Sequence, residues 1–274
     1  MNLLLMMLLL AAPPQSEWIG QAPTKITRMV SLAPNLTELV FELGHGNKIV
    51  GVTQFDNYPP AVVQLPRVGG FINPNVEAIM ATQPDIVLTT PNSGGKTVAN
   101  SLARLGIPVL SVPAQQWNHL YPAISTLADL LGSPHKGTQL ISNLRKQEAS
   151  LVRKFAHLPI TKALVVLGLR PLVCAGPTSF IDRFLPLTRI HNVVARGGPY
   201  PVLSAESVWS LKPSLIIDLS MSPENVSQTF WSNYPQKKGL QIRRFADDAL
   251  LRLGPRIFKA LEKLADEIHQ TKKQ

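Results

Sequence analysis

The sequence predicts an α/β fold made of two α/β lobes with mainly parallel sheets, joined by one long backbone helix. Short apolar runs alternate with amphipathic segments along most of the 274 residues, a pattern typical of parallel strands covered by helices on both faces. No proline interrupts the chain between Pro134 and Pro159, which predicts one unusually long helix. A segment of the first half also recurs in the second half, so we expect two related lobes.

The composition excludes several classes of protein. Apolar residues make up 45 % of the chain and charged residues 16 %, so the chain can bury a core and is not intrinsically disordered. The net charge is +10, but the basic residues are scattered, and we therefore expect no nucleic-acid partner. Cys174 is the single cysteine, which excludes an internal disulfide framework and a zinc knuckle built from paired cysteines.

The N-terminus begins with the apolar run MNLLLMMLLLAA at 1–12. This run is far shorter than the roughly 20 residues that span a bilayer, but it has the length of the apolar region of a signal peptide. We predict a signal peptide over 1–22. No cysteine follows the run, so a lipid anchor is not expected. The mature protein is predicted to be exported, soluble and periplasmic.

The first predicted lobe covers 26–132. Strands are expected at 28–32, 49–52, 85–88 and 108–112, where continuous apolar runs occur. Asn35 is expected to cap a helix that Gly44 ends, and Gly106 to end a second helix over 97–105. Strands that alternate with helices in this way indicate a parallel sheet.

The predicted backbone helix covers 133–158. Ser133 is a natural N-cap, and Pro134 occupies the first helical position, where proline is tolerated. Four apolar residues follow on one face at helical spacing: Leu140, Leu144, Leu151 and Phe155. A helix from 134 to 156 would be about 34 Å long at 1.5 Å per residue, which is enough to span a small domain.

The second predicted lobe covers 159–274. Strands are expected at 162–167 and 214–217, and helices begin at 179 and at 254. The last of these is a terminal amphipathic helix over 254–269.

Segments 76–88 and 205–217 form an internal repeat. In each copy a short capped helix carries a glutamate in its first turn and stops before a proline that leads into a buried strand. Glu77 and Glu206 are 129 positions apart, as are Pro84 and Pro213. The glutamates have two explanations: they complement the helix dipole, worth about 0.3–1 kcal/mol, or they dock onto basic sockets of a pseudo-symmetric partner. Two related lobes also predict a ligand in the cleft between them.

Enzyme chemistry finds little support in the residues. TPNSGGKT at 90–97 nearly matches a phosphate-binding loop, and Asp218 follows a strand as a magnesium-binding aspartate would. However, Thr90 replaces the first glycine, which permits the tight turn around phosphate, so a nucleotide-binding protein is only a distant alternative. No GxSxG motif occurs, and we predict that the protein is not an enzyme.

A bare metal ion as ligand would need several converging histidines and carboxylates. The six histidines are dispersed and form no HxH or HxxxH pair. The sequence therefore predicts no metal site.

Several motifs carry a resemblance to a known family. They are RMVSLAPNLTEL from Arg28, DNYPP from Asp56, LGIPV from Leu105, and PVLSAE from Pro201 to Glu206. These motifs and the order of elements resemble the periplasmic cobalamin-binding proteins, which belong to the solute-binding proteins with a single backbone helix (class III) that serve ABC importers. The resemblance covers roughly 26–270.

The resemblance implies a function and a set of site residues. It implies capture of a corrinoid (cobalamin) as transported ligand in the interlobe cleft and delivery to the permease of an ABC importer by a monomer. Glu77 and Glu206 match the glutamates that engage the permease. Four residues match positions that line the cleft: Phe55, Phe71, Val173 and Tyr200.

The cleft positions depart from the family at three places. Phe71 and Tyr200 stand where that family has tryptophans, and Val173 stands where it has a phenylalanine. Three of the four positions remain aromatic, which suits a large flat ligand because rings supply contact area at little entropic cost. An iron siderophore, haem or a metal ion stays open as the ligand of the same kind of receptor.

Overall fold

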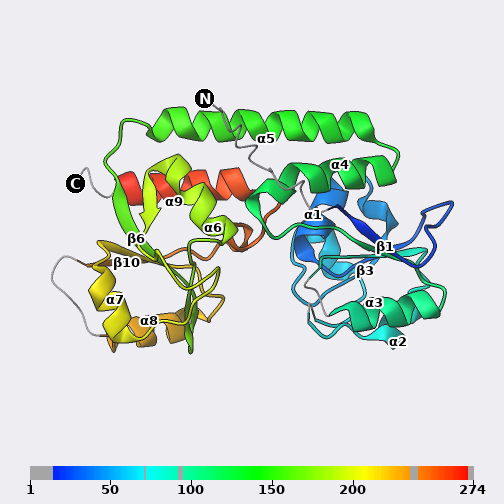
Figure 1. Ribbon diagram of the computed structural model, residues 1–274, viewed down its shortest axis with the longest axis horizontal. Helices are drawn as coiled ribbons and strands as arrows, with labels where there is room; N and C mark the ends of the chain where they lie inside the picture. Colours follow the sequence, from blue (N-terminus) through cyan, green and yellow to red (C-terminus); the bar gives the residue numbers. More distant parts are fainter. Residues whose placement is uncertain (1–14, 71, 92–94, 235–239, 271–274) are drawn as a thin grey trace, which may run out of the picture.

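The computed structural model describes residues 15–70, 72–91, 95–234 and 240–270, and it shows two α/β lobes bridged by a long helix (Figure 1). The predicted fold class is thereby confirmed. Helix α5 (Pro134–Phe155) runs along one side of both lobes. No helix within the described ranges is long and apolar enough to cross a membrane.

The N-terminal lobe contains a five-stranded sheet in the order β1-β5-β4-β2-β3. Its strands are β1 (Glu17–Ile19), β2 (Met29–Ser31), β3 (Ile49–Val52), β4 (Ile86–Thr89) and β5 (Val109–Ser111). All pairings are parallel except that of the edge strand β1 with β5.

Helices cover both faces of this sheet, since alternate strand residues point to opposite faces. Helices α1 (Pro34–Glu42) and α4 (Leu120–Leu130) share one buried cluster with Ile86 and Leu88. Helices α2 (Val76–Ala81) and α3 (Gly95–Arg104) share the other cluster with Val87. Three short 3-10 turns, η1 (Gly46–Lys48), η2 (Pro60–Gln64) and η3 (Trp117–His119), connect these elements.

The C-terminal lobe contains a second sheet in the order β10-β9-β6-β7, with β8 paired to β6. The strands are β6 (Thr161–Leu169), β7 (Leu172–Cys174), β8 (Ile190–Asn192), β9 (Leu215–Asp218) and β10 (Gln241–Arg244). Only the β6–β7 pairing is antiparallel. The accompanying helices are α6 (Phe180–Phe184), η4 (Leu185–Thr188), α7 (Ala205–Leu211), α8 (Glu224–Ser232), η5 (Asp248–Leu251) and α9 (Ile257–Gln270).

Helix α5 has 22 residues, about twice the average for globular proteins. Its predicted apolar face is the face that packs: Leu144, Leu151 and Phe155 are buried, and Leu140 is half-buried. Gly137 lets α5 approach α4 closely, because a Cβ at this position would collide with the Cβ of Ala128. Packing along its whole length therefore stabilises a helix that would be only marginal in isolation.

A second segment also connects the lobes. After β10 the chain turns through η5 into α9, which packs against α5. Phe258 of α9 belongs to the same buried cluster as Leu36 of α1. The C-terminal segment thus contacts both lobes, which the division of the sequence into 26–132, 133–158 and 159–274 did not anticipate; those boundaries stay a prediction.

The internal repeat is confirmed at the level of the backbone. Asn75 and Ser204 cap α2 and α7, accepting hydrogen bonds from Ala78 N and Ser207 N at 3.0 and 3.2 Å. After both helices the chain passes through a residue with left-handed backbone, Gln83 (φ 48°) or Lys212 (φ 49°), directly before the repeated prolines. Each proline leads into a fully buried strand, β4 or β9.

One local prediction was wrong. The N-cap of α1 is Ala33, which makes no side-chain capping bond, and Pro34 occupies the first turn. Asn35 instead donates from Nδ2 to the carbonyl oxygens of Ala114 and Leu253, at 3.1 and 3.3 Å. Its amide is therefore used to join two loops of the cleft and not to cap the helix.

Candidate ligand-binding site

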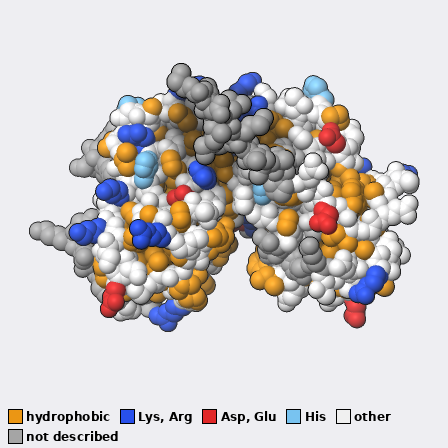
Figure 2. Space-filling view, in the orientation of Figure 1, with side chains coloured by type: hydrophobic (Ala, Val, Ile, Leu, Met, Phe, Trp, Pro, Cys, Tyr) orange, Lys and Arg blue, Asp and Glu red, His pale blue; other side chains and the backbone are white. Residues whose placement is uncertain are grey.

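A cavity of about 620 Å³ lies between the two lobes. The N-terminal lobe contributes the segments that follow β2, β3, β4 and β5, and the C-terminal lobe contributes those that follow β7, β9 and β10. Open α/β sheets bind ligands at these carboxyl ends of the strands. Figure 2 shows a notch between the lobes at the edge away from α5.

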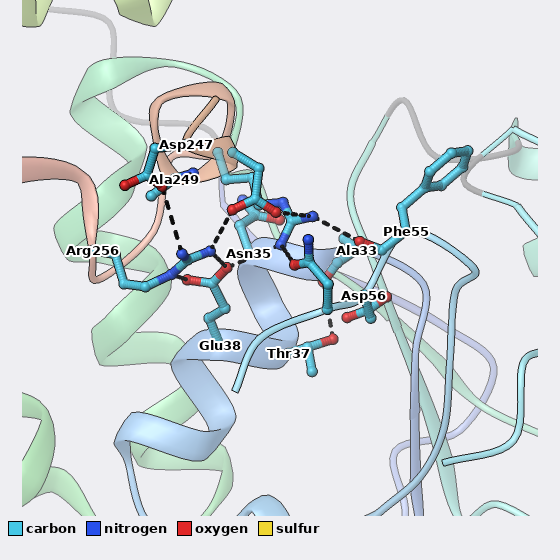
Figure 3. A network of polar contacts seen from close by, with 12 residues as sticks. Ala33, Asn35, Thr37, Glu38, Phe55, Asp56, Asp247, Ala249 and Arg256 are labelled. Carbon is cyan, nitrogen blue, oxygen red and sulfur yellow. Dashed lines mark hydrogen bonds and ion pairs between the residues drawn. The ribbon is translucent and has the colours of Figure 1, made fainter. Parts of the chain in front are cut away.

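Phe55 lies in the loop that follows β3 and forms one wall of the cavity. Its side chain is 51 % exposed, and its ring points away from the neighbouring polar network (Figure 3). The backbone of this loop is fixed at both ends of the residue. Phe55 N donates to Thr53 Oγ1 at 3.2 Å, and Phe55 O accepts from Arg252 at 2.7 Å. The ring is thus presented to the cavity by a rigid loop.

Tyr200 forms part of the opposite wall and is 47 % exposed. Hydrogen bonds from Gly176 N to Pro199 O and from Cys174 N to Pro201 O, at 2.8 and 2.9 Å, fix the backbone on both sides of it. Burial raises the pKa of the Tyr200 phenol above its ordinary value, so the phenol stays protonated at neutral pH.

The structure brings two of the four predicted cleft residues together in one cavity, Phe55 and Tyr200. Val173 lies in β7, half-buried and bridged to Val202, and is not among the residues that line the cavity. Phe71 lies outside the described residues.

The floor of the cavity is a network of charged side chains from both lobes (Figure 3). Glu38 of α1, with its side chain 1 % exposed, accepts from Arg256 at 2.6 and 2.8 Å and from Arg252 at 3.2 Å. Asp248 forms an ion pair with Arg252 at 2.8 Å and accepts a hydrogen bond from Arg256 at 3.1 Å. Burial alone would lower the pKa of Arg256, but its hydrogen bonds and charge contacts with Glu38 and Asp248 raise it. Asp247 also lies 3.9 Å from Arg256, so both arginines are paired with carboxylates.

Amide side chains supply the remaining polar surface of the cavity. Gln54 and Asn57 flank Phe55, while Asn35 lies in the first turn of α1 and Gln115 lies in the segment after β5. The Nε2 atom of Gln115 is buried and has no hydrogen-bond partner in the described part of the chain. A buried donor left unpaired costs about 1–3 kcal/mol, and this one belongs to a cavity-lining residue, so a movement of the Gln115 side chain would bring it within reach of an acceptor group of a ligand.

Sequence reasoning missed Asn35, Gln115, Asp248 and Arg252. The spacing of Asp248, Arg252 and Arg256 at successive four-residue intervals is a signal for charge pairing, but it does not indicate a partner 214 positions away. No sequence pattern indicates the amide side chains of Asn35 and Gln115, because their proximity depends on how the ends of the strands come together in the fold.

Glu77 and Glu206 are both exposed in the first turns of α2 and α7. Neither forms an ion pair with any residue that the structure describes. Figure 1 places α2 and α7 at the base of their respective lobes, on the side away from α5. The two glutamates thus belong to helices on one side of the molecule and have no ion-pair partner within the described part of the chain.

The near phosphate-binding loop and Asp218 do not form one site. Residues 92–94 lie outside the described residues, and the segment belongs to the N-terminal lobe, whereas Asp218 ends β9 of the other lobe. The Asp218 carboxylate is 0 % exposed and accepts from Ser220 N (2.8 Å), Ser227 Oγ (2.5 Å) and Trp231 Nε1 (2.6 Å). Asp218 therefore stabilises the lobe and is not available to a magnesium ion.

Metal-ligating side chains do not gather at the cavity. Over the described ranges no group of three or more His, Cys, Asp and Glu residues could hold a metal ion. Cys174 is fully buried, and burial raises the pKa of its thiol to about 12, so it is not a thiolate at neutral pH. Tyr200 and Met221 are the cavity-lining side chains with a phenol or thioether that could approach a metal centre of a ligand.

Two α/β lobes on a backbone helix, with a cavity at the carboxyl ends of both sheets, define a two-lobed binding protein. The family model described as "Periplasmic binding protein" matches residues 29–235. The chain belongs to this family, whose members are solute-binding proteins and not enzymes, and it is a binding protein of the ABC-importer type. A small-molecule ligand and an ABC permease are therefore its partners.

Particular relatives differ in the ligand that their names print. A Bacillus subtilis ABC transporter substrate-binding lipoprotein of uncharacterised function is 28 % identical over 267 residues, covering 94 % of this chain and 84 % of the relative. The vitamin B12-binding protein of Photorhabdus laumondii is 25 % identical over 245 residues, covering 88 % of both chains.

Solved structures share the whole fold. A periplasmic haem-binding protein from Pseudomonas aeruginosa superimposes with a TM-score of 0.81 at 25 % identity, covering 90 % of this chain and 94 % of that one. The periplasmic vitamin B12-binding protein of Vibrio cholerae gives a TM-score of 0.74 at 23 % identity, with 91 % and 99 % covered. The predicted resemblance to the cobalamin-binding, helical-backbone receptors is confirmed at the level of the family.

Proposed function

We propose that this protein is an exported periplasmic receptor, not attached to lipid, that binds a corrinoid in the interlobe cavity and delivers it to an ABC importer as a monomer. The observation that carries the ligand class is the chemistry of the cavity. Its walls are the rings of Phe55 and Tyr200, its polar surface is mainly amide, and the charged side chains among its described lining residues, Asp248 and Arg252, form an ion pair.

A corrinoid fits these properties. Its ring is large and flat, and its edge carries amide groups that both donate and accept hydrogen bonds. Such groups can pair with the Gln115 amide donor and with the other amides around the cavity without demanding a free charge from the protein. Its ring offers contact area to exposed aromatic side chains.

Haem is the second candidate, because the structure of a haem-binding relative superimposes closely and because Tyr200 provides a phenol in the cavity. One observation favours the corrinoid over haem. Arg252, the cation that the described residues contribute to the cavity lining, is already paired with Asp248 and Glu38, so haem carboxylates find no free positive charge among these residues.

Delivery would use Glu77 and Glu206, which we propose as docking residues for arginine or lysine side chains of the permease. Their exposure and their lack of an ion-pair partner among the described side chains support this role over a purely helical one. We also propose Phe71 and Val173 as residues of an extended ligand site, on the resemblance alone.

The test is calorimetric titration of the purified protein with cyanocobalamin and, separately, with haemin. Tight one-to-one binding of cyanocobalamin is expected. Replacing Tyr200 by alanine should weaken it about tenfold or more, because a buried ring contact of about 1.5–3 kcal/mol is lost. The matched variant Tyr200→Phe keeps the ring and should bind nearly as the native protein does.

Haem recognition predicts the opposite pattern. Tyr200→Phe would then lose as much haemin affinity as Tyr200→Ala, together with the absorption band of an iron–phenolate bond. Binding of haemin but not cyanocobalamin would show that the ligand is haem and not a corrinoid. Binding of neither would refute the proposal.

A further inference from the structure

We propose that Glu38 is a positioning residue for ligand binding, the anchor of an interlobe clamp that consists of Glu38, Asp248, Arg252 and Arg256. The clamp holds the Phe55 loop against the cavity and limits how far the lobes separate. The part of this proposal that concerns ligand affinity rests on the proposed function, whereas the part that concerns lobe separation does not.

Glu38 is the most enclosed member of the clamp. Its carboxylate comes from the first half of α1 in the N-terminal lobe, and its partners come from η5 and the segment after it, in the C-terminal lobe. Arg256 binds it in a two-point contact, Nη2 to Oε1 at 2.6 Å and Nε to Oε2 at 2.8 Å. A buried carboxylate is stable only with such partners, so the lobes cannot part here without exposing Glu38 and both arginines to water.

The two arginines connect Glu38 to the loop that carries Phe55, which forms one wall of the cavity. Arg252 donates to Phe55 O at 2.7 Å and to Asn57 Oδ1 at 2.9 Å. The guanidinium of Arg256 stacks 4.1 Å from the centre of the Tyr58 ring. Both contacts fall on the loop that carries Phe55, so its position depends on groups that Glu38 orients.

The same loop is also fixed from within its own lobe. Arg67 donates to Thr53 O and Asp56 O at 2.9 and 2.8 Å. Loss of Glu38 should therefore loosen the loop without unfolding it, since Arg67 keeps its inner half in place.

The clamp adds to the contacts that α5 and α9 already make between the lobes (Figure 1). It lies at the cavity, which Asp248 and Arg252 help to line, and it therefore resists a separation of the lobes at this place that the packing of α5 and α9 alone would not prevent. The unliganded protein should therefore already be close to the ligand-bound arrangement, which reduces the cost of ordering on binding.

The experiment compares Glu38→Gln with a matched control. Lys154→Gln removes ion pairs to Glu262 and Asp266, at 2.9 and 2.7 Å, between α5 and α9 and away from the cavity. Spin labels on Ala81→Cys and Ser210→Cys, at the exposed ends of α2 and α7, report the separation of the lobes by pulsed electron paramagnetic resonance. Cys174 is fully buried and does not compete for the label.

We expect the distance distribution of unliganded Glu38→Gln to shift to longer values and to broaden, while Lys154→Gln keeps the native distribution. Cyanocobalamin affinity should fall about tenfold or more in Glu38→Gln and remain native in Lys154→Gln. Saturating cyanocobalamin should restore the native distance distribution, a response that a merely destabilised protein would not show.

If Glu38→Gln does not fold, Arg256→Lys serves the same purpose, because it keeps the charge but loses the two-point contact; the same shift in smaller measure is expected. A native distance distribution in the folded variant overturns the clamp, and so does an equal affinity loss in Lys154→Gln. If the native protein binds neither cyanocobalamin nor haemin, the proposed function fails, and the distances still decide whether the clamp exists.

Discussion

The two lobes repeat one backbone design but differ at the position where the repeated strand ends. Thr89 ends β4 in the N-terminal lobe, and Asp218, 129 positions later, ends β9 in the C-terminal lobe. Asp218 binds the following helix α8 through Ser227 and Trp231. Within the described ranges, the Thr89 hydroxyl makes one long contact of 3.4 Å, to the carbonyl oxygen of Thr90, and none to a helix.

This difference assigns different tasks to the two lobes. The C-terminal lobe contains its own buried polar anchor, Asp218, whereas Glu38, a buried carboxylate of the N-terminal lobe, is satisfied by arginines of the other lobe. Outside, the lobes stay alike, with Glu77 and Glu206 at equivalent positions of α2 and α7. The two lobes are thus similar at the surface that we propose for docking, and they differ in which residues pair with their buried carboxylates.

The largest expected effect is a loss of uptake when the two equivalent glutamates, Glu77 and Glu206, are replaced. Replacing both Glu77 and Glu206 by arginine should reduce uptake of labelled cyanocobalamin to background in cells that depend on this receptor, because two like-charge contacts replace two attractive ones. Each single change should cost a similar, smaller loss of about tenfold. Calorimetry should give native ligand affinity for all three variants, and lost affinity would place the glutamates in the ligand site instead.

A smaller effect, on the free energy of unfolding, is expected at the position where the two repeated strands end differently, Asp218 and Thr89. Asp218→Asn keeps the shape but presents an amide donor to groups that already donate, so we expect a loss of about 2–4 kcal/mol in the free energy of unfolding. Thr89→Val at the equivalent position should change it by less than about 1 kcal/mol. Urea unfolding followed by tryptophan fluorescence measures both, and equal losses would mean that the lobes are anchored alike.

The smallest effect concerns the pH dependence of ligand binding. Burial raises the pKa of Tyr200, so the phenol stays neutral from pH 6 to 9, and affinity for cyanocobalamin should be flat over this range. Haemin held by a Tyr200 phenolate must release that proton, and its affinity would instead rise with pH. Titrations at several pH values distinguish the two, with Tyr200→Phe as the control that removes the pH response.

Most of the fold was predictable from the sequence because it is recorded in local patterns. The buried strands β2, β3, β4 and β9 are continuous apolar runs, and the caps Asn75 and Ser204 are the residue types that helices favour at this place. The strands β1, β7, β8 and β10 were missed, since runs of three or four residues are too short to stand out in the sequence. Asn35 was misassigned because its amide serves a contact with Leu253, 218 positions away.

The site was predictable only in part and for the same reason. Phe55 and Tyr200 were named from the family resemblance, and both line the cavity. The pairing of Glu38 with Arg252 and Arg256 depends on the meeting of the two lobes, which no local spacing records. Long-range polar pairs of this kind require the three-dimensional structure.

Glu38 and Arg256 are 218 positions apart in the chain, so the N-terminal lobe cannot pair this buried carboxylate from its own residues. A polypeptide made from its N-terminus holds this carboxylate without its partners until the last helix has been synthesised. Truncation before η5 would remove about one tenth of the chain and yet leave the first lobe with a buried charge unpaired. The C-terminus is therefore the segment whose arrival commits both lobes to one native molecule.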